Sequence, residues 1–168
     1  HGEKCYNVSV TVTNTGNTDA YVRTIFAFEL AEDWDVSDVQ DDVMIHLNTN
    51  EITDTASGHY VWSWLGEPVE IDGQKYAIAE ALYVGSSTVH TNGVLPAGET
   101  SRPSLLQVFL DSKATNKDIE SLGETYDILV VSQAVQTMGF ADAKTALDEA
   151  LACGTGAVID CRLEMDEM

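Results

Sequence analysis

Five aspartates between residues 33 and 42 form a dense group of possible metal ligands. They are Asp33, Asp35, Asp38, Asp41 and Asp42, and the surrounding sequence predicts a loop or a short helical turn. Ca²⁺ binds carboxylate oxygens, so calcium is the cofactor that this segment suits. The spacing differs from that of an EF-hand loop, and the run has no glycine for the sharp turn of such a loop. The alternative is a solvated loop whose carboxylates cap a helical turn.

The segment HYVWSWL, residues 59–65, places three aromatic side chains on one face of a predicted strand. Tyr60, Trp62 and Trp64 alternate there with Val61 and Leu65. Flat rings in a row are a possible platform for stacking sugars. The alternative is that at least one of the indoles packs into the core of the protein.

The chain contains three cysteines, Cys5, Cys153 and Cys161, and this odd number leaves several pairings open. In an exported protein, one disulfide and one free or intermolecular thiol would be expected. Cys153 and Cys161 could close a short loop, or Cys5 could join the N-terminal strand to the C-terminal segment. Three reduced thiols are the remaining alternative. The spacing does not complete a zinc site.

Sequence motifs of catalysis are missing from the chain, which predicts a protein that is not an enzyme. The four histidines are scattered, and none belongs to an H-E-x-x-H motif. A G-x-S-x-G elbow, a phosphate-binding loop and a dinucleotide-binding G-x-G-x-x-G before a helix are also missing.

The charge of the chain is strongly negative and restricts its partners. Asp and Glu number 28 against 8 Lys and Arg, a formal net charge of -20. Such a field repels nucleic acid and anionic lipid, and it favours cations, basic partners and solubility. No apolar run approaches the roughly 20 residues of a membrane span, so membrane insertion is not expected.

The elements that position these residues are predicted to be mostly strands. Residues 8–29 read as a hairpin, with an alternating first arm, a turn-forming loop at 14–19 and a second arm. In the second arm Val22, Thr24, Phe26 and Phe28 share one face, and Tyr21, Arg23, Ile25 and Ala27 share the other. Apolar residues on both faces predict a strand that is central in its sheet or covered on both sides.

Further strands are predicted over 43–47, 60–65, 104–110 and 126–137, with a second hairpin over 69–84 that turns at Asp72 and Gly73. Helices are predicted near 116–122, capped by Asn116 and ended by Gly123, and near 140–152. The tail after residue 156 could form a last strand or a loose end. This pattern predicts one domain over residues 1–168, mainly β, with the architecture of an antiparallel two-sheet β-sandwich. Its type is expected to be jelly-roll or immunoglobulin-like, with one or two short helices.

Three segments resemble exported Gram-positive proteins of the camelysin/TasA-like group, which a dedicated signal peptidase releases. The first is HGEKCYNVSVTVTNTGNTDAYVRTIFAFE, residues 1–29, which matches the recurring pattern "PGE..–K–V.V.NTG..DAYVR" of that group. Residues 103–137 and GFADAKTALDEA, residues 139–150, look like the C-terminal half of the same kind of protein. Together these segments cover well over half of the chain.

The resemblance implies a secreted, jelly-roll-like sandwich that in some members is a subunit of matrix fibres at the cell surface. Fibres of that kind can form when a strand of one subunit completes the sheet of the next. Members usually carry a further strand before the "PGE" region, so we expect an open edge in this chain that accepts a partner. Some camelysin-like proteins are described as metalloproteases, but this sequence lacks a zinc-protease motif.

Our leading hypothesis from the sequence is a secreted cell-surface or extracellular-matrix protein, of the biofilm type, that associates with itself or with other surface proteins. The alternative is an extracellular binding module that depends on carbohydrate or calcium. The carbohydrate would be held by Tyr60, Trp62 and Trp64, and the calcium by the aspartates of residues 33–42.

Overall fold

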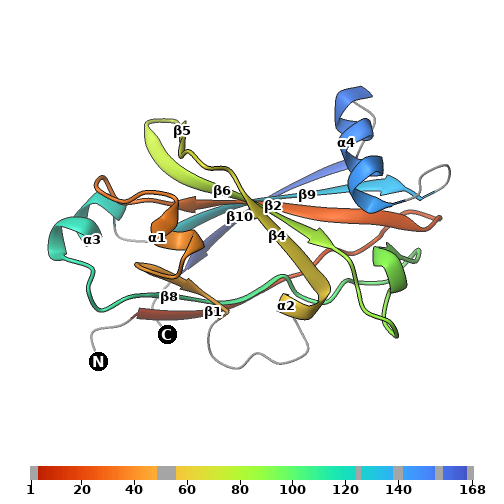
Figure 1. The fold of residues 1–168 in the computed structure, drawn as a ribbon, viewed down its shortest axis with the longest axis horizontal. Helices are drawn as coiled ribbons and strands as arrows, with labels where there is room; N and C mark the ends of the chain where they lie inside the picture. Colours follow the sequence, from red (N-terminus) through yellow and green to blue (C-terminus); the bar gives the residue numbers. More distant parts are fainter. Residues whose placement is uncertain (1–3, 49–55, 124–125, 138–141, 154–156, 166–168) are drawn as a thin grey trace.

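Two antiparallel sheets that face each other across an apolar core form the body of the protein (Figure 1). The structure, a computed structural model, describes residues 4–48, 56–123, 126–137, 142–153 and 157–165. The predicted class, a mainly β protein of the two-sheet sandwich type, is confirmed.

The small sheet has the strand order β1-β8-β3, and the large sheet has the order β10-β9-β2-β6-β4, with β5 paired to β6 and β7 paired to β2. The strands of the small sheet are β1 (Lys4–Val10), β8 (Leu105–Leu110) and β3 (Ile45–Leu47). Those of the large sheet are β2 (Ala20–Glu29), β4 (Tyr60–Trp64), β5 (Val69–Ile71), β6 (Gln74–Tyr83), β7 (Val94–Leu95), β9 (Tyr126–Gln136) and β10 (Ala157–Met165).

Short helices lie at the ends and on the outer surface of the sandwich (Figure 1). They are α1 (Ser37–Gln40), α2 (Ala56–His59), the 3₁₀ turn η1 (Thr91–Gly93), α3 (Asn116–Leu122) and α4 (Ala143–Cys153).

Strand β2 is the centre of the large sheet, because it pairs with β6 on one side and with β9 on the other. The predicted division of its two faces is confirmed. Phe26 and Phe28 lie in the core between the sheets, whereas Tyr21 packs with α4 on the outer surface. A strand buried on both faces needs apolar residues on both, as the sequence of β2 has.

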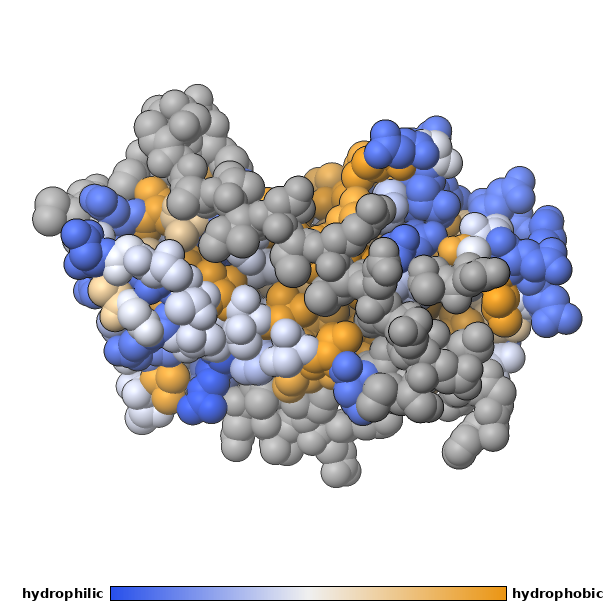
Figure 2. Space-filling model, turned by 180° about the vertical axis from the view of Figure 1, so that it is seen from behind, coloured by the Kyte–Doolittle hydropathy of each residue, from blue (hydrophilic) through white to orange (hydrophobic). Residues whose placement is uncertain are grey.

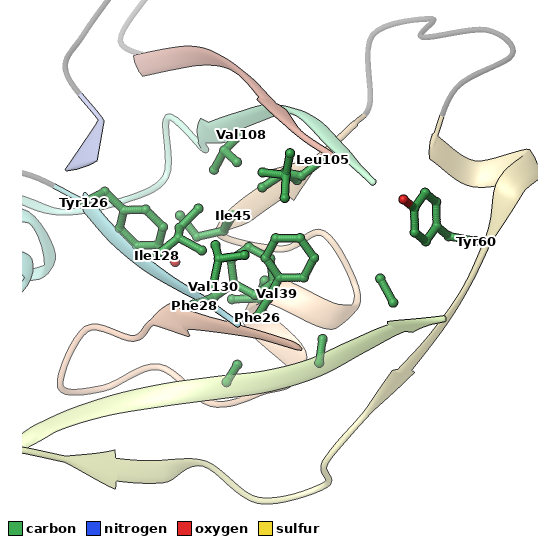
Figure 3. Close-up of a cluster of buried hydrophobic side chains, with 14 of the residues drawn as sticks. Phe26, Phe28, Val39, Ile45, Tyr60, Leu105, Val108, Tyr126, Ile128 and Val130 are labelled. Carbon is green, nitrogen blue, oxygen red and sulfur yellow. The ribbon is translucent and has the colours of Figure 1, made fainter. Parts of the chain in front are cut away.

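The core is built by side chains from both sheets and from α1 (Figure 3). Phe26 of β2 and Ile128 of β9 are buried opposite Leu105 of β8 and Ile45 of β3. Each fully buried side chain of this size stabilises the fold by about 1.5 to 3 kcal/mol relative to an exposed one. Val39 of α1 is buried in the same cluster, so α1 covers one side of the core.

The predicted hairpin over residues 8–29 is wrong. Strand β1 pairs with β8 in the small sheet, whereas β2 lies in the large sheet, so the loop between them crosses from one sheet to the other. The buried side chain of Asn14 fixes this crossing. Its Nδ2 donates to the carbonyl oxygens of Thr18 (2.8 Å) and Leu95 (2.9 Å), and its Oδ1 accepts from the N–H of Gly16 (3.0 Å).

The second predicted hairpin is confirmed. Ile71 pairs with Gln74, which leaves Asp72 and Gly73 as a two-residue loop. Both loop residues have positive φ angles, 50° and 80°, and this is the backbone of the type I′ turn that suits the twist of paired strands.

The predicted helix over 116–122 is confirmed, but its cap is Thr115 rather than Asn116. The Thr115 hydroxyl accepts the N–H of Asp118 (3.2 Å), and the Asp118 carboxylate accepts the N–H of Thr115 (2.9 Å). This reciprocal pair is a capping box, which satisfies two main-chain donors at once. Gly123, at φ 83°, ends the helix as predicted.

Helix α4 covers one end of the outer face of the large sheet, where it encloses a buried charge. The Arg23 guanidinium of β2 lies 2.6 Å from Glu80 Oε2 of β6 and 3.0 Å from Asp148 Oδ1 of α4. Its Nε donates to Gln133 Oε1 of β9 at 2.5 Å. The side chain of Arg23 is 4% exposed, that of Glu80 is 17% exposed and that of Asp148 is 49% exposed.

These exposures predict unequal roles for the two carboxylates. We expect Glu80→Ala to lower the free energy of unfolding by about 2 to 3 kcal/mol, because it removes the enclosed partner of a buried cation. Asp148→Ala should cost less than about 1 kcal/mol, because water screens that half-exposed pair. Chemical denaturation of both variants measures the difference. Equal losses would contradict the assignment of Glu80 as the principal partner.

Candidate functional site: the open side of the sandwich

The aspartates of residues 33–42 do not converge on one point. Asp35 Oδ1 accepts the N–H of Val36 (2.8 Å), and Asp38 Oδ2 accepts the N–H of Asp35 (2.8 Å), so both stabilise the start of α1. Asp33 pairs with Lys117 of α3 at 3.3 Å, and Asp42 Oδ1 accepts the N–H of Leu47 (3.3 Å). Across the described ranges, no three His, Cys, Asp or Glu residues are grouped so that they could hold a metal ion. Calcium binding stays a prediction from the sequence.

The three aromatic residues of β4 share one face of the strand, as predicted, and this face points into the sandwich. Tyr60 is 5% exposed, and its hydroxyl donates to the carbonyl oxygen of Arg102 (2.7 Å). Burial raises the pKa of this phenol well above its usual range. The ring of Trp62 stacks on that of Phe26 at 5.1 Å, and Trp64 stacks on Phe28 at 5.7 Å. A sugar platform on these rings stays a prediction, and the rings are already partly buried against the core.

The opposite faces of β4 allow a matched test of this packing. We expect Trp62→Ala to lower the free energy of unfolding by about 2 to 3 kcal/mol, because it removes a ring stacked against buried Phe26. Val61→Ala on the outer face, where Val61 is 52% exposed, should change stability by less than about 0.5 kcal/mol. Denaturation curves measure both values. A Trp62→Ala variant as stable as the parent would show that the ring is not part of the core.

The cysteine pairings stay open. Cys5 lies on β1, Cys153 ends α4 and Cys161 lies on β10. Their side chains fall outside the described part of the structure, so the predicted disulfides stay predictions.

A chain of hydrogen bonds that the sequence did not predict joins Tyr83, His90 and Glu99. His90 Nδ1 lies 2.5 Å from the Tyr83 hydroxyl oxygen, and His90 Nε2 lies 2.9 Å from Glu99 Oε1. A neutral imidazole with its hydrogen on Nε2 satisfies both neighbours, since it donates to the carboxylate and accepts from the phenol. Tyr83 is completely buried, and burial raises the pKa of its phenol. These hydrogen bonds position the loop after β6, and the Glu99 side chain at their outer end is 55% exposed.

The edge of β1 is the feature that most clearly presents free main-chain groups. Within the described sheets, β1 has a neighbour on one side only, β8. Beyond β1, the N–H of Asn14 donates to Glu99 O (2.9 Å) and the N–H of Ser101 donates to Val12 O (2.8 Å). These bonds flank the pair Thr13–Thr100, which makes it a non-hydrogen-bonded pair of the ladder. The N–H and C=O of Thr13 therefore point away from residues 98–101, toward the free edge.

Over residues 5–18 this edge lacks two of the devices that protect sheet edges, charged residues and prolines. Folded proteins block such edges with charged residues, prolines, bulges or covering segments. Residues 5–18 contain no Asp, Glu, Lys, Arg or Pro, although 21% of the chain is charged. The register with β8 is interrupted once, between Asn7 and Val10.

A pocket of about 300 Å³ opens between this edge and the end of β9. Its walls come from two segments, residues 12–18 with Ala20 and residues 132–136 of β9. None of the lining residues is charged, and residues 128–141 of the chain contain no Asp, Glu, Lys or Arg. Seen from behind, the protein shows apolar residues gathered in the middle of the surface (Figure 2).

The fold and this edge define a class of protein, an antiparallel β-sandwich in which β1 is an edge strand of the described small sheet and residues 5–18 carry no Asp, Glu, Lys or Arg. No protein-family model, no curated protein and no solved structure matches the chain. Among the described helices, none is long and apolar enough to cross a membrane.

Proposed function

We propose that the protein is a secreted, non-enzymatic structural protein of the cell surface or extracellular matrix that self-associates into fibres by strand addition. The observation that carries the proposal is the edge of β1, which has one neighbour within the described sheets and continues to Thr13 beside an uncharged pocket. Secretion and the matrix role rest on the resemblance of residues 1–29, 103–137 and 139–150 to the camelysin/TasA-like group.

Strand addition at β1 would satisfy main-chain groups and cover apolar surface at the same time. The small sheet has three strands, whereas the large sheet is wider, so a strand added beside β1 would lie opposite the inner face of the large sheet. Each new main-chain hydrogen bond contributes about 1 kcal/mol net. Apolar contact with the pocket would add about 25 cal/mol for each Å² that it buries.

The charge distribution fits an association that depends on salt. Two copies repel each other through net charges of -20 each, but residues 5–18 of the edge and the residues that line the pocket carry no charge. Repulsion between surface charges is screened over about 10 Å at 0.1 M salt and about 3 Å at 1 M. The hydrogen bonds and apolar contacts of the edge act at shorter range.

A proline at the free edge tests the site directly. We expect Thr13→Pro to weaken self-association at least about tenfold, because it removes the N–H that points outward and places a ring on the edge. Thr13→Val is the matched control, since it also loses the 2.8 Å contact of the Thr13 hydroxyl with Thr100 but keeps the N–H. Sedimentation velocity and electron microscopy compare the two at matched concentration. Equal assembly by both variants, with equal thermal stability, would exclude this edge as the contact.

Salt provides a second test. Raising NaCl from about 0.1 M to about 1 M should increase both the midpoint of thermal unfolding and the sedimented fraction, because screening weakens repulsion within and between copies. Calcium added at constant ionic strength separates specific binding by the aspartates of residues 33–42 from screening. A protein that stays monomeric at high concentration under all these conditions would overturn the proposed function.

A further inference from the structure

We infer that the second surface of the proposed contact is the edge of β4: the edge of β1 in one copy pairs, antiparallel, with the edge of β4 in the next copy. The inference rests on the proposed self-association and names the surface that β1 meets. The partner is therefore a second copy of this chain, and each copy uses two different edges, one from each sheet.

Strand β4 is an edge of the large sheet, because within the described sheets it pairs with β6 only. The N–H of Val84 donates to His59 O (2.8 Å), and the N–H of Leu65 donates to Ile78 O (3.0 Å). Hydrogen-bonded and non-hydrogen-bonded pairs alternate between these two bonds. The residues at non-hydrogen-bonded positions, whose N–H and C=O groups point away from β6, are Tyr60, Trp62 and Trp64.

The edge of β4 has no charged residue, like the edge of β1. Residues 55–66 and residues 5–18 both contain no Asp, Glu, Lys or Arg. Among the described side chains, Val61 and Leu65 are the large apolar residues that are exposed, at 52% and 53%. A basic partner would be attracted to acidic surface, whereas an uncharged edge of a chain with a net charge of -20 suits the other uncharged edge of the same chain.

The side chains of the β1 edge alternate between solvent and core. Thr13 directs its N–H and C=O to the free edge, and its side chain is exposed. The neighbouring side chains of Val12 and Asn14 are buried. Both of these buried residues also line the uncharged pocket beside the edge. A strand added at Thr13 therefore has one face toward solvent and one face toward the pocket.

This alternation decides which face of β4 would cover the pocket. In an antiparallel ladder, residues that direct their main-chain groups at each other lie opposite, and their side chains share a face. Thr13 would thus lie opposite one of the three aromatic residues of β4. The outward side chains of β4, Val61 and Leu65, would then lie on the same face as Val12, over the pocket. A parallel pairing would place Val61 and Leu65 on the solvent side, so the antiparallel direction is the one that buries them.

The use of two different edges allows growth beyond a dimer. A pairing of β1 with β1 would be isologous and would close as a dimer. A pairing of β1 with β4 is heterologous, because the two strands belong to different sheets. It leaves a free β4 on one copy and a free β1 on the other, so further copies can join at both ends. The proposed fibre requires this kind of contact.

Charge placed on the outer face of β4 tests this surface. We expect Val61→Lys with Leu65→Lys to weaken self-association at least about tenfold, and Val61→Glu with Leu65→Glu to do the same, because either charge would be buried at the contact. An effect of net charge alone would have opposite signs in the two variants. The matched controls are Ser87→Lys with Thr88→Lys and Ser87→Glu with Thr88→Glu, which place the same charges at exposed positions of the loop after β6. Sedimentation at matched salt and protein concentration measures all four.

A mixture of two blocked variants tests the pairing of β1 with β4. Thr13→Pro blocks the edge of β1 and keeps β4, whereas Val61→Lys with Leu65→Lys blocks β4 and keeps β1. Each variant alone should stay monomeric, and an equimolar mixture should form heterodimers in sedimentation velocity, because one free edge of each kind remains. The midpoint of thermal unfolding checks that each variant is folded. Thr13→Lys replaces the proline if the proline lowers this midpoint.

Full assembly of the β4 variants, together with loss of assembly by Thr13→Pro, would overturn the role of β4. The edge of β1 would then stand as the proposed contact with a different second surface. Folded blocked variants whose mixture forms no heterodimer would also overturn the pairing of β1 with β4. A parent protein that stays monomeric would overturn the proposed function, and this inference with it.

Discussion

The crossing of the chain at Asn14 is the interaction on which the arrangement of the two sheets depends. The amide of this residue joins the loop 14–18 to Leu95, and its main chain pairs with Gly98 and Glu99. Because Asn14 is buried, each of these polar groups needs a partner, and the network supplies them. Strand β1 is thereby directed into the small sheet and β2 into the middle of the large one. The free edge of β1 is a direct result of this division.

Local patterns in the sequence were sufficient to predict the strands, turns and helices, but they did not predict which strands pair with each other. The alternation of β2 predicted its two buried faces, and Asp72 with Gly73 predicted the β5–β6 turn, because both signals lie within a few residues. The same turn chemistry at residues 14–19 predicted a hairpin that does not exist. Asn, Thr and Gly there support a crossing between sheets, and the partner that decides between the two, Leu95, is distant in the sequence. The capping box at Thr115 could have been found from the spacing of Thr115 and Asp118.

The candidate site was only partly open to prediction. The two-residue period of a strand predicted that Tyr60, Trp62 and Trp64 share one face. That this face points into the core depends on Phe26 and Phe28 of β2 in the same sheet, on which the two indole rings stack. The uncharged run of residues 5–18 is visible in the sequence. Its meaning depends on strand order, since the same run in the middle of a sheet would only mark a buried strand. The hydrogen bonds that join Tyr83, His90 and Glu99 follow no sequence motif. A left-handed backbone at His90 contributes to bringing these side chains together.

An unprotected sheet edge is ordinarily a liability, since any other exposed edge can pair with it. In this protein the charge of the remaining surface opposes indiscriminate pairing at long range, whereas residues 5–18 of the edge and the lining of the pocket beside it carry no Asp, Glu, Lys or Arg. For the proposed self-association, this distribution predicts that two copies approach only where ionic strength or local concentration overcomes the repulsion. Strand addition at this edge would also be limited in register, since a slip by one residue moves every side chain of the added strand to the other face of the sheet. In this proposal, repulsion controls when association begins, and strand register controls which association persists.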